Sequence, residues 1–109
     1  MFDKQNEIDM ALLAAEIAGD EIPLLDVHGL NVDEAKKEVL EFLCREHAGS
    51  ARQNIKAVKI ITGRGSGRLY FAILSYLKTK PVDFLESVRG AESSNNIGAV
   101  ILAVLAPNK

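Results

Sequence analysis

Asp26 and His28 carry the side chains in this sequence that are best suited to proton transfer. They are two residues apart, so on an extended strand both side chains project from the same face. A carboxylate beside an imidazole can fix its tautomer, and such an imidazole can move protons during phosphodiester cleavage. The alternative is that Asp26 only accepts hydrogen bonds from nearby backbone N–H groups and that His28 is an ordinary turn residue. Spacing alone favours this alternative slightly.

A second segment, residues 62–68, combines three glycines with two arginines. It follows the β-branched run of residues 58–61 and precedes a helical pattern, so it is predicted to join a buried strand to a helix N-terminus. Such a junction presents backbone N–H groups and a positive dipole to an anion, and Arg64 and Arg68 add donors suited to phosphate. The spacing fits neither a Walker loop nor the dinucleotide fingerprint. A tight turn that only needs positive φ is the alternative, and the arginines tilt the interpretation toward anion binding.

The surrounding elements predict that these two segments lie side by side. Residues 24–29 form a short strand and turn, and a helix over residues 32–47 follows, with Asn31 as its cap and Glu34 as the capping-box partner. Strand, helix and strand in this order form a βαβ unit, in which the two strands run parallel. The carboxyl ends of both strands then lie at one edge of the sheet, where open α/β sheets bind ligands.

The rest of the chain completes a mixed α/β pattern. Helices are expected over residues 6–18 and 69–77, and strands over residues 82–88 and 98–105. The last strand is apolar throughout, so it should be central in the sheet or covered on both faces. A polar loop over residues 90–96 joins these two strands. The predicted order is one helix followed by βαβαββ.

Length and composition limit the function classes. The chain has 109 residues, 48% of them hydrophobic, so we expect one globular domain with a core. No apolar run is long enough for a membrane span, and no signal peptide is expected. The single cysteine, Cys44, excludes an internal disulfide and suits a cytoplasmic protein. We expect Cys44 to be a small packing residue of its helix.

The net charge of −2 argues at first against a nucleic-acid partner, but the charges are unevenly placed. Residues 1–23 carry six acids and one base, a sum of −5, so the remaining residues sum to +3. From residue 57 onward, seven bases and three acids give +4. The half of the chain that contains the glycine turn is therefore mildly basic, which is compatible with a phosphate-binding face.

Two segments resemble the signature motifs of the small MutS-related (Smr) domain family. Residues 25–30, LDVHGL, resemble its opening LDxHG motif, and residues 61–67, ITGRGSG, resemble its second motif, Thr or His followed by GxGxG. Residues 98–101, GAVI, resemble its closing strand. Both motifs occur in the family's order. We therefore predict an acidic N-terminal helical arm over residues 1–22 and an Smr-like domain over residues 23–107.

The resemblance implies a two-layer βαβαββ sandwich of the α/β class, with a mixed four-stranded sheet and the N-terminal helix as an extension. It also implies a nucleic-acid partner, DNA or RNA, and an endonuclease activity that nicks or cleaves it by phosphodiester hydrolysis. By position it assigns cleavage to Asp26 and His28. The residues predicted to bind phosphate and nucleic acid are Gly29, Thr62, Gly63, Arg64, Gly65, Ser66, Gly67 and Arg68.

Two other functions and one cofactor stay open. The same segments could bind nucleic acid without cleaving it. Alternatively, Tyr70, Phe71 and Leu74 make the outer side of their helix apolar, which suggests that the N-terminal arm or a second copy in a homodimer covers this surface. The acids and histidines form no cluster with metal-ligand spacing, so no metal-binding residue is assigned. A divalent cation, Mg²⁺ or Mn²⁺, stays open as a cofactor of cleavage.

Overall fold

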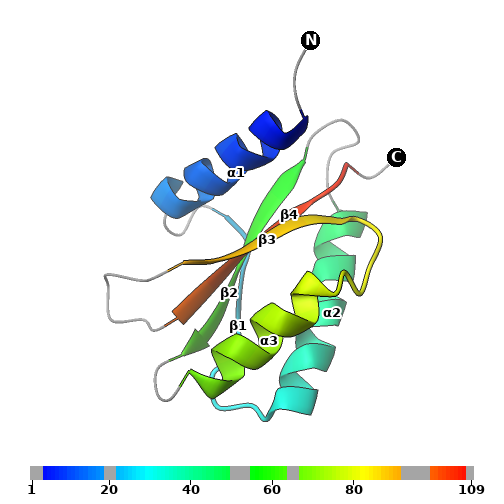
Figure 1. Ribbon diagram of the computed structural model, residues 1–109. Coiled ribbons are helices and arrows are strands. Elements are labelled where there is room, and N and C mark those ends of the chain that lie inside the picture. The colour runs from blue at the N-terminus through cyan, green and yellow to red at the C-terminus, as the bar shows by residue number, and fades with distance from the viewer. Residues whose placement is uncertain (1–3, 19–21, 50–54, 64–66, 92–98, 108–109) are drawn as a thin grey trace.

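The computed structural model describes residues 4–18, 22–49, 55–63, 67–91 and 99–107, which fold as a mixed α/β domain (Figure 1). In chain order the elements are α1 (Lys4–Ala18), β1 (Leu24–Asp26), α2 (Val32–Ala48), β2 (Lys56–Gly63), α3 (Arg68–Lys78), β3 (Leu85–Ala91) and β4 (Ala99–Leu105). The strands form one sheet in the order β1-β2-β4-β3. β1 and β2 are parallel, and the other pairs are antiparallel. The predicted α/β class, element order and mixed sheet are confirmed.

The helices α2 and α3 pack on one face of the sheet (Figure 1). Their apolar stripes meet alternate residues of β2 and β4, because successive side chains of a strand point to opposite faces. The buried residues of this main core are Val27, Ala35, Val39, Phe42, Leu43, Val58, Ile60, Ile73, Leu77, Leu85, Ile101, Ala103 and Leu105. Since α2 follows β1 and α3 follows β2, both helices begin at the edge of the sheet where these parallel strands end.

The helix α1 lies on the opposite face of the sheet (Figure 1). Its buried residues Ile8 and Leu12 are one turn apart, and they form a second cluster with Ile61, Val100, Leu102 and Val104. α1 therefore adds a third layer to the predicted two-layer sandwich. The hypothesis that this arm covers the outer side of α3 is wrong, because the sheet lies between them. Among the described residues, none of the helices has both the length and the apolar character needed to cross a membrane.

The strand β3 begins at Leu85, three residues later than the predicted strand over residues 82–88. The Leu85 N–H donates to the carbonyl of Val82 at 3.3 Å, so the chain turns here. Val82 and Phe84 are half-buried against the main core. These two apolar residues are therefore half-buried from within a turn, and a local sequence pattern does not distinguish such a turn from a strand.

Two single residues also differ from expectation. Gly90, placed in a loop by the sequence, belongs to β3 and lies against α3. A Cβ added at Gly90 would lie 2.8 Å from the Cζ of Tyr70, so the absence of a side chain lets the tyrosine ring approach the strand. Cys44 is exposed on α2 and does not pack as expected.

Candidate functional site

The carboxyl ends of β1 and β2 bring the two chemically distinctive segments together, as the βαβ order predicts. Asp26 is in register with Ile61, and the Val27 N–H donates to the Ile61 carbonyl at 2.9 Å. One step further, Gly63 has φ +89°, and a Cβ added there would lie 2.7 Å from the Cβ of His28. The approach of these two turns therefore requires a glycine at position 63, both for its backbone conformation and for its lack of a side chain.

Asp26 and His28 form the predicted carboxylate–imidazole pair. The Nδ1 of His28 lies 2.7 Å from the Oδ1 of Asp26, and the His28 backbone N–H donates to the same oxygen at 3.0 Å. Both side chains are accessible, with 71% of the His28 and 42% of the Asp26 side-chain surface exposed. Asp26 accepts a backbone hydrogen bond, as expected if it only stabilises the turn, and it also contacts the imidazole, as expected for a catalytic pair. The geometry is compatible with both interpretations.

The protonation state of Asp26 determines which tautomer of His28 the pair favours. Partial burial raises the pKa of the Asp26 carboxyl, but the backbone and ring hydrogen bonds from His28, together with its charge, lower it by more. The net result is a pKa below the ordinary value of 3.8. Asp26 is therefore ionised near neutral pH and can only accept hydrogen bonds, so Nδ1 of His28 carries the proton. In the neutral ring this leaves Nε2 as a base.

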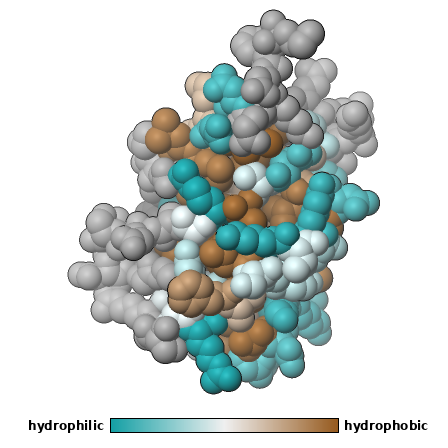
Figure 2. Space-filling view, in the orientation of Figure 1, coloured by the Kyte–Doolittle hydropathy of each residue, from teal (hydrophilic) through white to brown (hydrophobic). Residues whose placement is uncertain are grey.

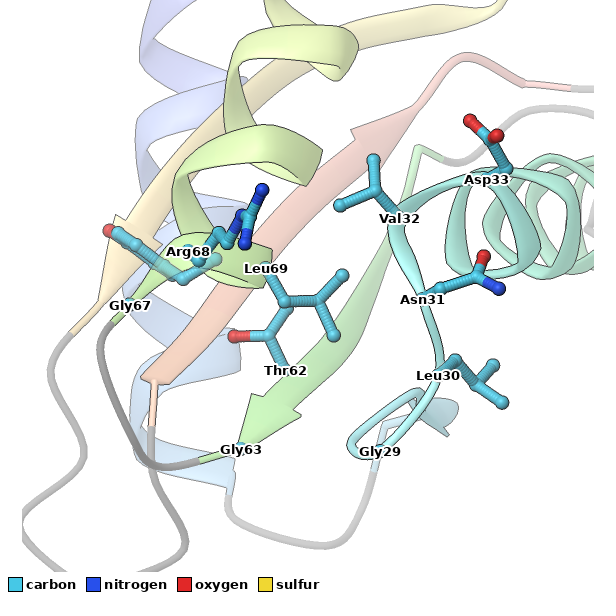
Figure 3. Close-up of a pocket in the computed structure, with 11 residues that line it drawn as sticks. Gly29, Leu30, Asn31, Val32, Asp33, Thr62, Gly63, Gly67, Arg68 and Leu69 are labelled. Atoms are coloured by element: carbon cyan, nitrogen blue, oxygen red, sulfur yellow. The ribbon is translucent and has the colours of Figure 1, made fainter.

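A pocket of about 560 Å³ opens between the first turns of α2 and α3 (Figure 3). Its described lining residues are Gly29, Leu30, Asn31, Val32, Asp33, Thr62, Gly63, Gly67, Arg68, Leu69 and Tyr70. Figure 3 shows the segment that leads into α2 facing the start of α3 across the end of β2. The pocket thus lies at the ligand-binding edge that the parallel pair β1–β2 predicts.

A bulge in β2 places Thr62 at the floor of this pocket. Ile61 pairs with Val100 and Gly63 pairs with Ala99, so Thr62 is the extra residue between them. The Thr62 residue is buried, yet it contributes to the pocket wall. Bulges often re-aim a side chain next to functional sites, and here the bulge ends the strand at the point where the chain must turn toward α3.

The α3 side of the pocket has the properties of an anion-binding end. Gly67 is the N-cap, with φ +81° and no side-chain cap hydrogen bond, and the first turn of α3 contains no acidic residue. The helix begins with the exposed Arg68. A helix N-terminus carries a partial positive charge, and a guanidinium beside it adds a full one. These features favour an anion at this end.

Most of the predicted binding residues line the pocket, and the catalytic pair lies beside it. Gly29, Thr62, Gly63, Gly67 and Arg68 all line the pocket. The described residues that line it include neither Asp26 nor His28, which lie at its margin beside position 63. The predicted residues Arg64, Gly65 and Ser66 lie outside the described part of the chain.

Sequence reasoning missed the wall that α2 contributes. Leu30, Asn31, Val32 and Asp33 line the pocket, although none was predicted as a site residue. The signal was present, because the capping box at Asn31 marks a helix N-terminus directly after β1. Two helices that follow two parallel strands must both begin at the same edge of the sheet.

No metal-ligand cluster emerges from the part of the chain that the structure describes. Within it, no group of three or more His, Cys, Asp or Glu side chains is placed to hold a metal ion. The Asp26–His28 pair alone supplies fewer ligands than a protein-held site requires. These residues do not fit a resident metal centre.

Comparisons with known proteins agree with the motifs. The family model described as the Smr domain matches residues 25–104. The crystal structure of the Smr domain of Thermus thermophilus MutS2 is similar to this fold, with a TM-score of 0.64 and 28% sequence identity. The similarity covers 79% of this chain and 100% of that one. A search of curated proteins found no match.

Proposed function

This chain belongs to the Smr domain family, and we propose that it binds nucleic acid through the pocket between α2 and α3 and cleaves a phosphodiester beside it. The observation that carries the proposal is the meeting of two features at one edge of the sheet. The start of α3, with Arg68, lines this pocket together with Gly63, and Gly63 contacts the turn that holds the Asp26–His28 pair. One feature suits a phosphate and the other suits proton transfer.

In the proposed complex, a backbone phosphate lies at the α3 N-terminus. The first amides of α3 and the Arg68 guanidinium would donate to its oxygens. The close approach of Gly63, which lines the pocket, to His28 places the histidine at the margin of the pocket. A strand that runs across the pocket could therefore present a phosphodiester to the imidazole.

His28 would perform the proton transfers. With Nδ1 donating to Asp26, the neutral ring offers Nε2 to take a proton from the attacking hydroxyl or water, and the protonated ring can return it to the leaving oxygen. Asp26 would hold the ring orientation and stabilise the imidazolium. Arg68 and the amides would stabilise the charge that develops on the phosphoryl oxygens. The proposal assigns the proton transfers to these side chains, and the assay below tests whether a divalent cation takes part.

A cleavage assay tests this function. Supercoiled DNA and structured RNA should be incubated with the wild type, Asp26→Ala and His28→Ala, each with Mg²⁺, with Mn²⁺ and with a chelator. Loss of a general acid–base typically costs about 100-fold or more in rate, so His28→Ala should show that decrease. Asp83→Ala, which alters an exposed acid on the turn before β3, is the matched control. Equal cleavage by all four proteins would contradict the assigned roles.

Binding without cleavage is the second candidate function. The observation that favours it is the position of Asp26 and His28 outside the described lining of the pocket, with the His28 side chain 71% exposed. Catalytic groups usually lie in a more enclosed site. Affinity that falls with salt and with Arg68→Ala, together with no cleavage under any metal condition, would establish this function instead.

A further inference from the structure

The solvent-exposed residues of α3 form a single stripe that begins at the pocket. They are Arg68, Phe71, Ser75 and Lys78. Their spacing of three, four and three residues places them on one side of the helix. α3 contains no acidic residue, so this stripe carries two cations, one on either side of an aromatic ring along the helix.

Phe71 is unusual because a large aromatic ring is mostly exposed directly beside the pocket. The residue is 63% exposed. A Cβ added at the pocket residue Gly67 would lie 3.2 Å from the Cε2 of Phe71, so the edge of the ring lies against the N-cap of α3. Figure 2 shows apolar and hydrophilic surface side by side over α3 on the face in view.

A second aromatic residue supports the Phe71 ring. The rings of Tyr70 and Phe71 lie 5.1 Å apart between centroids and meet edge to face at 74°. Tyr70 is half-buried, lines the pocket and packs over Gly90. Tyr70 lies between α3 and β3, so Phe71 contacts a half-buried ring while much of its own surface faces solvent. An aromatic ring has few rotatable bonds, so ordering it on a flat partner has a small entropic cost.

We propose that Phe71 is a stacking platform for an unpaired base of a strand whose phosphate lies at the α3 N-terminus. This proposal rests on the proposed function and adds its substrate class: the site prefers single-stranded or looped nucleic acid to a duplex. Single-stranded nucleic acids bind where aromatic rings and cations alternate along a surface, since the rings stack with bases and the cations meet phosphates. In a duplex the bases are already stacked on each other and cannot cover the ring.

The charge of the stripe favours an anionic partner over a second copy of this chain. A two-fold dimer places the same surface on both sides of the interface. Two α3 stripes would therefore bring Arg68 and Lys78 against the same two cations, with no acid on α3 to compensate them. A nucleic acid strand is anionic and therefore complements the charge of this stripe.

Fluorescence anisotropy on one labelled 15-nucleotide strand, used alone and annealed to its complement, tests this proposal. We expect Phe71→Ala to weaken single-strand binding by about tenfold or more, because base–aromatic stacking is worth that much, while duplex binding stays unchanged. Phe71→Leu, which keeps the apolar volume, should behave as Phe71→Ala does. Met10→Ala is the matched control, since Met10 is 64% exposed but lies on α1, on the other face of the sheet.

Phe71→Trp supplies a direct signature. The chain contains no tryptophan, so this variant has a single indole at the platform. Its single-strand affinity should equal that of the wild type, and its fluorescence should be quenched by the single strand and not by the duplex. This readout does not depend on whether Phe71→Ala folds normally.

Arg68→Ala separates failure of this proposal from failure of the proposed function. Suppose that Arg68→Ala weakens binding to both the single strand and the duplex. If Phe71→Ala then changes neither affinity, or changes both equally, the stacking proposal is wrong and the proposed function stands. If the wild type binds neither the single strand nor the duplex, both proposals fail. Light scattering tests whether a second copy of this chain covers Phe71 instead. If the wild type is a dimer and Phe71→Ala is a monomer with unchanged single-strand affinity, the stacking proposal is wrong.

Discussion

The two helix N-termini that line the pocket differ in every feature that controls anion binding. At α2, the Asn31 side chain accepts from the Glu34 N–H at 2.8 Å and the Glu34 carboxylate accepts from the Asn31 N–H at 3.3 Å. Asp33 and Glu34 also place two acids in the first turn of α2. At α3, the cap is Gly67, which makes no side-chain cap hydrogen bond, and the first turn contains Arg68 and no acid.

The chain itself therefore balances the two dipoles to different degrees. Both helices present a positive end to the same space. At α2, the chain satisfies its own amides and places two acids beside the dipole, so this end stabilises the fold. At α3, a glycine cap and an arginine keep the end positive, and this is the end to which the proposed function assigns a phosphate.

The glycine turns before the two helices give the largest expected effect. Gly63→Ala should lower the free energy of unfolding by about 3 kcal/mol, because a left-handed backbone is strained for alanine and the added Cβ would meet His28 at 2.7 Å. Gly29→Ala is the control: its φ is +82°, but nothing lies within 4 Å of an added Cβ. Strain alone predicts a loss of about 1 kcal/mol. Urea unfolding measures both, and equal losses would show that the two turns do not press against each other.

The charged residues of the two first turns should differ in their effect on binding. Arg68→Ala should weaken single-strand binding by about tenfold and reduce the slope of log affinity against log salt by about one, as expected for one lost phosphate contact. Asp33→Asn removes a negative charge from the opposite wall and should raise the affinity slightly. Titrations at several salt concentrations measure both variants. A larger change in affinity for Asp33→Asn than for Arg68→Ala would show that the phosphate lies at α2 and not at α3.

The cap of α2 should matter for stability alone. Asn31→Ala should lower the free energy of unfolding by about 1 kcal/mol, because the Glu34 N–H loses its acceptor. Nucleic-acid affinity should change little, because the proposed phosphate position is at the α3 end of the pocket. Asn31→Gly is the control, with an expected loss of only a few tenths of a kcal/mol. A parallel loss of affinity would remove the distinction between the two helix ends.

The pair at the margin of the pocket gives the smallest expected effect. The folded-state pKa of Asp26 lies below 3.8, so its stabilisation is present above that pH and is lost as the pH falls through the lower folded value. The melting temperature of the wild type should exceed that of Asp26→Asn slightly at neutral pH, and the difference should vanish in strong acid. Because the Asp26 side chain is 42% exposed, solvent screens the interaction. A difference that grows toward acid pH would contradict the shift.

Sequence patterns predicted the elements that hold the site more accurately than the site itself. The capping box at Asn31, the buried stripe of α2 and the central position of β4 are as predicted, because each depends on residues close in sequence or on one continuous apolar run. The start of β3 was misplaced because Val82 and Phe84 pack in a turn. Apolar residues indicate that a segment is buried, but they do not indicate whether its backbone forms a strand or a turn.

The pocket wall from α2 and the placement of α1 required three-dimensional information. The spacing of Ile8 and Leu12 predicts one buried side of α1, but it does not indicate which face of the sheet receives it. In the same way, the sequence placed Tyr70, Phe71 and Leu74 together on the outer side of α3, but only Phe71 is exposed, because Tyr70 and Leu74 pack against the main core. The roles of Asp26 and His28 stay a prediction until cleavage is measured.

Local patterns identify most of the helices and strands, the cap of α2 and the glycine turns, because hydrogen bonding and side-chain periodicity within a segment act over a few residues. The contact of position 63 with His28, the pocket shared by the two helix N-termini and the place of the Phe71 ring beside Gly67 follow from the folded arrangement. These contacts join residues distant in the chain, so they depend on strand register and on the packing of helices against the sheet.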